Sequence, residues 1–301
     1  MCLNKHPILI TNKKSRALKN HMHFISGLPR SGSTLLAALL RQNPSFHAAM
    51  SSPVAPLMNN CLEQMGAGGE FASFFDEATR KRTCHGLFDA YYHEQIQETS
   101  DTQVIFDTNR SWTARLHQLT ELFDDFKVIC CVRNPAWVMD SLEVIYRKNP
   151  FDYSRMYSPQ SRQTVYSRCE AQISAGGTVG SAWTSLKEAY YGEFSDRLLL
   201  IDYDLLTQHP ERTLALLYEF IGERAFGHDF DNVDYEASEF DQSLGVKGLH
   251  SVKKKVEFKP RRSILPPELF QKYSEMAFWQ DSTGTAANII AAKNTANKAP
   301  Q

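Results

Sequence analysis

Residues 24–36 constrain the fold more than any other stretch, because an apolar run, a glycine-rich turn and an apolar helical segment follow one another there. The turn nearly matches the phosphate-binding pattern G-x-x-x-x-G-K-[ST], with both glycines at the right spacing and Thr34 in the last place. Ser33 stands where the pattern has lysine, and the cation inside the turn is Arg30. The stretch predicts a strand, an anion-binding loop and a helix.

Such a loop binds an anion even without the lysine. Its successive backbone N–H groups form a concave site, and the helix N-terminus adds partial positive charge. Gly27 and Gly32 allow backbone angles that a Cβ would hinder, and Pro29 stiffens the turn. The lysine serves β- and γ-phosphates beside Mg²⁺, so Ser33 favours a donor with less charge and no metal. The alternative is a plain turn between a strand and a helix.

Composition narrows the class of protein. The chain has 301 residues, of which 42% are hydrophobic and 22% are charged, as in ordinary globular domains. The formal net charge of −1 does not indicate a nucleic-acid partner. The six cysteines lack C-x-x-C spacing, which favours reduced thiols over disulfides or a zinc site. The N-terminal apolar patch is too short for a signal peptide, and no apolar run reaches about 18 residues, so we expect a cytoplasmic protein without a membrane span.

Strand-like and helix-like segments alternate along most of the chain. This order predicts a three-layer α/β/α fold with a central parallel sheet, like that of P-loop NTPases. We expect one domain over residues 22–281, a loose lead-in at 1–21 and a disordered tail at 282–301. The clearest expected strands are residues 22–27, 102–107, 126–132 and 197–202.

Four polar or glycine residues follow the ends of these strands, namely Gly27, Asp107, Arg133 and Tyr203. Because the carboxyl ends of parallel strands share one edge of a sheet, we expect a ligand site there. Arg133 precedes Ser141 by two helical turns, so both could grip one phosphate through charge-assisted bonds. The alternative is an arginine paired at a helix N-terminus and a surface serine.

Three motifs together resemble those of sulfotransferases that use 3′-phosphoadenosine 5′-phosphosulfate (PAPS). They are the segment Gly27–Leu35, the segment Val132–Pro135 with Ser141, and the segment Tyr203–Glu211. Their order and spacing fit from residue 22 to about residue 222, and the first motif is most similar to tyrosylprotein-type and bacterial members. The resemblance implies an enzyme that transfers a sulfuryl group from PAPS to a hydroxyl or amine acceptor, releases adenosine 3′,5′-bisphosphate and needs no metal.

The resemblance also assigns residues to the two ends of PAPS. The 5′-phosphosulfate would be held by Pro29, Arg30, Ser31, Gly32, Ser33 and Thr34. The 3′-phosphate would be held by Arg133 and Ser141. Tyr203 would lie near the adenine or support its loop.

The sequence departs from the family pattern at two catalytic positions. Thr108 stands where many members have a lysine, and Arg110 is the candidate for the missing charge. Ser51 and Ser52 stand near the place of the glutamate that tyrosylprotein-type members use. We therefore consider four residues for the chemistry: Arg30, Asp107, Arg110 and His250.

Asp107 is the first candidate for the general base, although it could instead cap a helix or pair with Arg110. His250 lies in a lysine-rich segment, and residues 245–260 form either a lid over PAPS or a solvated loop. Two other functions stay open, a small-molecule kinase using ATP or GTP and a non-catalytic nucleotide-binding protein. The sequence leaves the acceptor open among small molecules, carbohydrates and peptides, and it does not indicate an oligomeric state.

Overall fold

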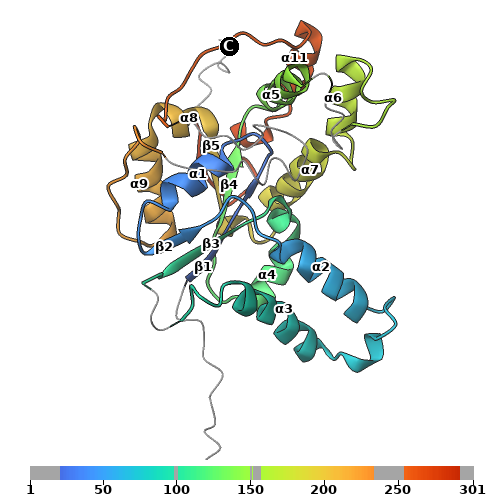
Figure 1. The fold of residues 1–301 in the computed structure, drawn as a ribbon, viewed down its shortest axis with the longest axis vertical. Coiled ribbons are helices and arrows are strands. Elements are labelled where there is room, and N and C mark those ends of the chain that lie inside the picture. Colours follow the sequence, from blue (N-terminus) through green and yellow to red (C-terminus); the bar gives the residue numbers. More distant parts are fainter. Residues whose placement is uncertain (1–20, 98–100, 150, 152–156, 234–253, 292–301) are drawn as a thin grey trace, which may run out of the picture.

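Parallel strands form the centre of the molecule, and helices cover both faces of the sheet (Figure 1). The computed structural model describes residues 21–97, 101–149, 151, 157–233 and 254–291. The strand order is β2-β3-β1-β4-β5-β6, and every neighbouring pair is parallel. The strands are β1 (His21–Gly27), β2 (Phe46–Ala48), β3 (Val104–Thr108), β4 (Val128–Val132), β5 (Leu198–Asp202) and β6 (Asn288–Ile290).

Helices cover both faces of the sheet, and α5, α6 and α11 pack together in a separate apolar cluster. The α-helices are α1 (Ser33–Leu40), α2 (Val54–Met65), α3 (Glu77–Tyr91), α4 (Leu116–Leu122), α5 (Pro135–Lys148), α6 (Val165–Ile173), α7 (Thr178–Tyr191), α8 (Tyr203–Gln208), α9 (Pro210–Ile221) and α11 (Pro267–Ser274). Short 3₁₀ helices are η1 (Ala72–Phe74), η2 (Arg110–Arg115), η3 (Ser195–Arg197) and η4 (Phe278–Gln280). Helices α1, α8 and α9 cover one face of the sheet, and α3, α4 and α7 cover the other. Within the described part of the chain, none of these helices has the length and apolar character that crossing a bilayer requires.

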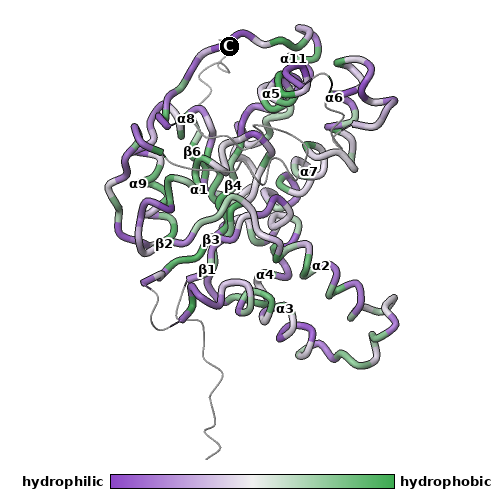
Figure 2. The backbone as a smooth tube through the Cα atoms, in the orientation of Figure 1, coloured by the Kyte–Doolittle hydropathy of each residue, from purple (hydrophilic) through white to green (hydrophobic). Residues whose placement is uncertain are grey.

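Apolar strands explain why both faces are covered. Phe24 of β1 packs toward α3 and α4, whereas its neighbour Ile25 packs toward α1 and α9. All five residues of β4 are buried, as expected for a parallel strand between two helical layers. Figure 2 shows these apolar strands at the centre and polar segments around them. Polar groups that follow the strands therefore gather at the carboxyl edge of the sheet.

The predicted fold class is confirmed, and one predicted boundary is wrong. The sequence predicts a disordered tail from residue 282, but β6 pairs in parallel with β5, with Ile289 opposite Leu200. Three residues in an alanine- and asparagine-rich context carry too little periodicity to signal a strand, and only the neighbouring β5 makes the pairing possible. Residues 1–20 and 292–301 lie outside the described residues.

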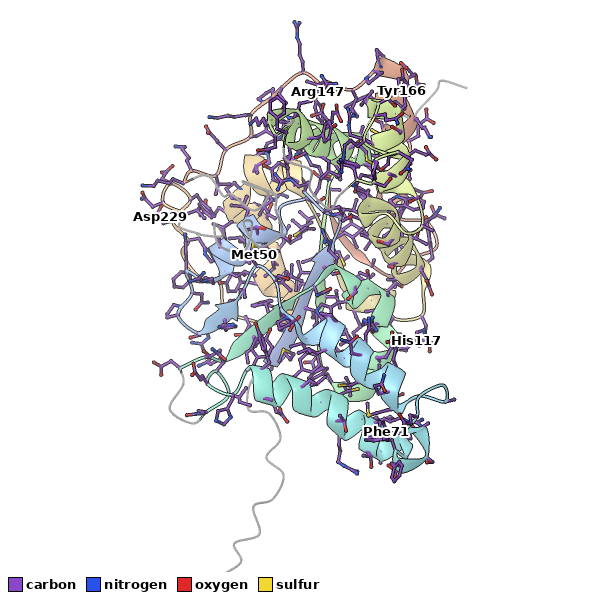
Figure 3. All side chains as sticks on the ribbon, turned by 45° about the vertical axis from the view of Figure 1, so that its right-hand side comes forward. Met50, Phe71, His117, Arg147, Tyr166 and Asp229 are labelled. Carbon is purple, nitrogen blue, oxygen red and sulfur yellow. The ribbon has the colours of Figure 1, made fainter. Side chains whose placement is uncertain are left out.

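Helices α2 and α3 pack against each other and extend away from the sheet (Figure 1). Aromatic side chains divide along this projection. Phe88 and Tyr92 are buried near the sheet, whereas Phe71 and Phe74 at the tip are 48% and 77% exposed. Figure 3 shows Phe71 at the far end of the projection, well away from β1.

Candidate functional site

The loop between β1 and α1 depends on its two glycines. Gly27 has φ of 110°, and a Cβ built on it would lie 2.1 Å from the carbonyl oxygen of Cys131, so only glycine lets β1 end this close to β4. Gly32 has φ of 93°. Between them, Arg30 has φ of 60°, a left-handed conformation that costs free energy for a residue with a Cβ. Contacts elsewhere must therefore hold this loop in place.

The N-terminus of α1 presents N–H groups to the loop. Gly32 is the N-cap residue and supplies no side-chain acceptor, and the first turn holds no acidic residue. The N–H groups at the start of a helix lack partners within the helix and carry partial positive charge. Ser33 and Thr34 add two partly exposed hydroxyl groups in the same turn. This turn can bind a phosphate or sulfate group.

Arg30 connects this loop to the second predicted anion motif. Its Nε donates a hydrogen bond of 3.2 Å to Oγ of Ser141 on α5. A serine hydroxyl that accepts one bond can still donate its own proton. The structure thus brings together two motifs that lie more than a hundred residues apart in the chain.

Arg133 follows β4 directly. Helix α5 begins two residues later, because Asn134 caps it by accepting a 3.0 Å bond from the N–H of Ala136. The Arg133 guanidinium lies 4.3 Å from the centre of the Tyr203 ring. Its Nε is 3.8 Å from Oδ1 of Asp204 and is buried without a hydrogen-bond acceptor among the described residues. Burial lowers the pKa of Arg133. A buried guanidinium N–H without an acceptor is costly, and an anion would satisfy it.

Tyr203 lies between the two motifs. A Cβ on Gly32 would be 2.8 Å from its Cδ2, so the ring packs directly on the loop, while Arg133 stacks on the ring. Asp202 caps α8 by accepting a 2.8 Å bond from the N–H of Asp204, which fixes the first residue of the helix. Burial raises the pKa of Asp202 to about 6.

Arg261 is a candidate site residue that the sequence does not indicate. Its guanidinium lies 4.9 Å from the centre of the Trp137 ring on α5 and forms an ion pair with Asp140. Burial is the main cause of the lowered pKa of Arg133, and the positive charge of Arg261 lowers that pKa further. The pair Arg261-Arg262 is a visible basic cluster, but no sequence pattern shows that this segment returns to α5.

Asp107 lies at the predicted edge of the sheet but is enclosed there. Its Oδ2 accepts bonds from Ser52 Oγ at 2.5 Å and Tyr92 OH at 2.8 Å, and its Oδ1 accepts from Trp112 Nε1 at 2.7 Å. Burial raises the pKa of Asp107, whose side chain has no exposed surface. Three donors and full enclosure favour a positioning role, in which Asp107 holds the end of β2 and η2, over a role as general base.

Arg110 lies beside the start of the anion-binding loop. Its carbonyl oxygen accepts a 2.9 Å bond from Ser26 Oγ, one residue before Gly27. The Arg110 side chain is exposed, yet the surrounding protein desolvates its guanidinium enough to lower its pKa. Thr108, at the place of the missing lysine, is only 6% exposed.

Two predictions fall on residues that the structure does not describe. They are His250 and residues 245–253 of the predicted lid. Ser31 is placed, and its hydroxyl donates a long bond of 3.4 Å to the carbonyl oxygen of Pro29 within the loop. Within the described ranges, no group of three or more histidine, cysteine, aspartate and glutamate side chains could hold a metal ion.

A family model described as "Sulfotransferase family" matches residues 23–226, which is more than half of the chain. The chain belongs to the sulfotransferase family. The matched residues of this sulfotransferase include the anion-binding loop, Arg133, Ser141 and Tyr203, whereas Arg261 lies beyond them.

Individual relatives and solved structures are similar to parts of this chain, which spans about a third of the length of the curated relative that it matches. This chain is 30% identical over 135 residues to the nodulation protein NoeE of Sinorhizobium fredii, a match that covers 40% of this chain and 30% of NoeE. The sulfotransferase domain from the curacin biosynthetic pathway has a TM-score of 0.54 at 17% identity, covering 85% of this chain and 96% of that domain. The sulfotransferase domain of the Synechococcus PCC 7002 olefin synthase gives a TM-score of 0.46 at 18% identity, with coverages of 88% and 96%. The likeness to the curacin domain supports the fold.

Proposed function

We propose that this sulfotransferase uses PAPS as its donor, transfers the sulfuryl group to a hydroxyl or amine acceptor, and releases adenosine 3′,5′-bisphosphate. One observation carries the proposal. Two cationic motifs meet at one edge of the sheet, where Arg30 bonds to Ser141 and the Tyr203 ring touches both Gly32 and Arg133. PAPS carries two separate anionic groups on one nucleoside, and a pair of adjoining anion sites matches that distribution of charge.

The residues present fit the donor. The open N–H groups at the start of α1 suit the 5′-phosphosulfate, since that turn holds no competing carboxylate. The buried Nε of Arg133, which finds no acceptor among the described residues, suits the 3′-phosphate. Ser141 can donate its hydroxyl proton to the same group, and Arg261 adds a second charge beside Arg133.

During the reaction, negative charge develops beside the anion-binding loop. As the acceptor atom bonds to sulfur, the bond between sulfur and the bridging oxygen breaks, and that oxygen gains negative charge. Arg30 and the N–H groups of the loop are positioned beforehand to stabilise this charge, which is the largest catalytic contribution in many enzymes. Arg110 is our candidate for contact with the sulfuryl oxygens. The acceptor proton leaves to a base, for which His250 is the candidate, since Asp107 is enclosed by three donors.

Transfer of label from ³⁵S-labelled PAPS to a panel of phenols, sugars and peptides tests this function. We expect transfer by the wild-type protein, and a loss of about a hundredfold or more in Arg30→Ala, because a charge beside the leaving oxygen is removed. Arg224→Ala removes an exposed arginine beyond the end of α9 and should keep full activity. Tight binding of PAPS without transfer to any acceptor would instead support a non-catalytic nucleotide-binding protein.

A further inference from the structure

A buried carboxylate on α5 organises the segment that carries Arg261. The side chain of Asp140 has no exposed surface. Its Oδ1 accepts a 2.8 Å bond from Ser263 Oγ and a 2.7 Å bond from the N–H of Ile264, and its Oδ2 pairs with Arg261. Three successive contacts from one carboxylate attach residues 261–264 to the helix that begins beside Arg133.

These contacts set the place of the Arg261 guanidinium. Arg133, Trp137 and Ser141 follow one another at intervals of four residues, so they share one face of α5 and the turn before it. Arg261 stacks on Trp137 in the middle of this face, and Asp140 fixes it from the next turn. The Arg261 side chain remains 35% exposed, so one side of it is open to solvent.

Arg133 and Arg261 repel each other: burial is the main cause of the lowered pKa of Arg133, and the positive charge of Arg261 lowers that pKa further. In a partly buried setting, this repulsion favours turning the more exposed one toward water unless a counter-charge holds it. Asp140 is that counter-charge for Arg261, whereas the ion pair of Arg133 with Asp204 is longer, at 3.8 Å. The pair of arginines is thus kept together while the Nε of Arg133 has no acceptor among the described residues.

We propose that Asp140 is a positioning residue that holds Arg261 beside Arg133, and that the two arginines so placed select nucleotides with a 3′-phosphate. The inference rests on the proposed function, because it assigns the second anion site to that phosphate. A dianionic 3′-phosphate between two arginines gains ion pairs and charge-assisted bonds from both, whereas a free 3′-hydroxyl carries no charge and forms weaker hydrogen bonds with them.

Glu143 offers a matched control on the same helix. It is a buried carboxylate one turn after Asp140, and it accepts bonds of 2.8 and 2.6 Å from Arg168 of α6. Arg147 adds a third bond of 2.7 Å to the same carboxylate. Glu143→Gln therefore disturbs a buried ion pair of similar size without touching Arg261, and it reports the cost of lost stability alone.

Calorimetric titration of the full chain with adenosine 3′,5′-bisphosphate and with adenosine 5′-phosphate tests the inference. For Asp140→Asn we expect about tenfold weaker binding of the bisphosphate and less than about a threefold change for the monophosphate. Arg261→Gln should give the same pattern, and the double variant should be no worse than Arg261→Gln, because Asp140 acts through Arg261. Glu143→Gln should lower the midpoint of thermal unfolding and leave the ratio of the two affinities unchanged.

The outcomes separate the inference from the function on which it rests. A wild-type protein that binds both nucleotides equally would overturn the proposed donor and this inference with it. A wild-type protein that prefers the bisphosphate, with Asp140→Asn keeping that preference or losing both affinities in parallel, would overturn the inference alone. An additive loss in the double variant would likewise show that Asp140 does not act through Arg261.

Discussion

Replacing Arg133 with alanine is expected to weaken the binding of adenosine 3′,5′-bisphosphate by about a hundredfold or more, while binding of adenosine 5′-phosphate changes by less than about threefold. Truncating one partner of a buried, hydrogen-bonded charge pair typically costs about 2–5 kcal/mol. In this site the guanidinium is partly buried, its Nε has no acceptor among the described residues, and the Tyr203 ring fixes its orientation. Titration calorimetry with both nucleotides measures the difference.

Arg197 provides a matched control for this variant. It also stacks on an aromatic ring, with its guanidinium 5.3 Å from the centre of Phe126, and it pairs with Asp125 at 3.5 Å. It precedes β5 and so lies at the opposite edge of the sheet from Arg133. Arg197→Ala should leave both affinities unchanged. Equal weakening of the two nucleotides in Arg133→Ala would remove Arg133 from a 3′-phosphate site.

Gly27→Ala is expected to destabilise the fold by more than about 4 kcal/mol, or to prevent folding altogether, because two costs coincide. The new Cβ would fall 2.1 Å from the carbonyl oxygen of Cys131, and both atoms belong to central strands that cannot separate without breaking the sheet. The φ of 110° adds the cost of a backbone conformation that alanine rarely adopts. Denaturant unfolding measures the free energy of unfolding.

Gly222 and Gly68 serve as controls that separate the cost of backbone strain from the cost of the close contact. Gly222 has φ of 75° but no atom within 4 Å of a built Cβ, so Gly222→Ala should cost only about 1 kcal/mol from backbone strain. Gly68 has neither a positive φ nor a close neighbour, and Gly68→Ala should be nearly neutral. If Gly27→Ala unfolded at the same denaturant concentration as Gly222→Ala, the close contact between β1 and β4 would be contradicted.

The sequence predicts the fold and the loop well because both depend on local patterns. Continuous apolar strands followed by helices predict a parallel sheet, and the spacing of Gly27 and Gly32 marks the loop between the first strand and helix. The rule that strand ends share one edge brings Arg133 and Tyr203 to the loop, and the structure places them there in contact. The sequence places both anion motifs at that edge but does not predict the contact between Arg30 and Ser141.

Other features could not be predicted because they depend on distant packing. The sequence ranks Asp107 first as a base, since a carboxylate at a strand end usually faces the site. Its enclosure depends on Ser52, Tyr92 and Trp112, which come from three different segments. The position of Arg261 also depends on a distant residue. It pairs with Asp140, more than a hundred residues earlier, and no local sequence pattern predicts that pairing.

Binding of adenosine 3′,5′-bisphosphate in the absence of Mg²⁺ tests the central claim most directly. The kinase alternative has the same loop geometry but needs a triphosphate and a metal, so the two functions predict opposite results. Thermal unfolding of the wild-type protein is followed with the bisphosphate plus a chelator, and separately with ATP and Mg²⁺. We predict a clear rise in the unfolding midpoint with the bisphosphate and none with ATP and Mg²⁺. Stabilisation by ATP and Mg²⁺ without any response to the bisphosphate would contradict the assignment of PAPS as the donor.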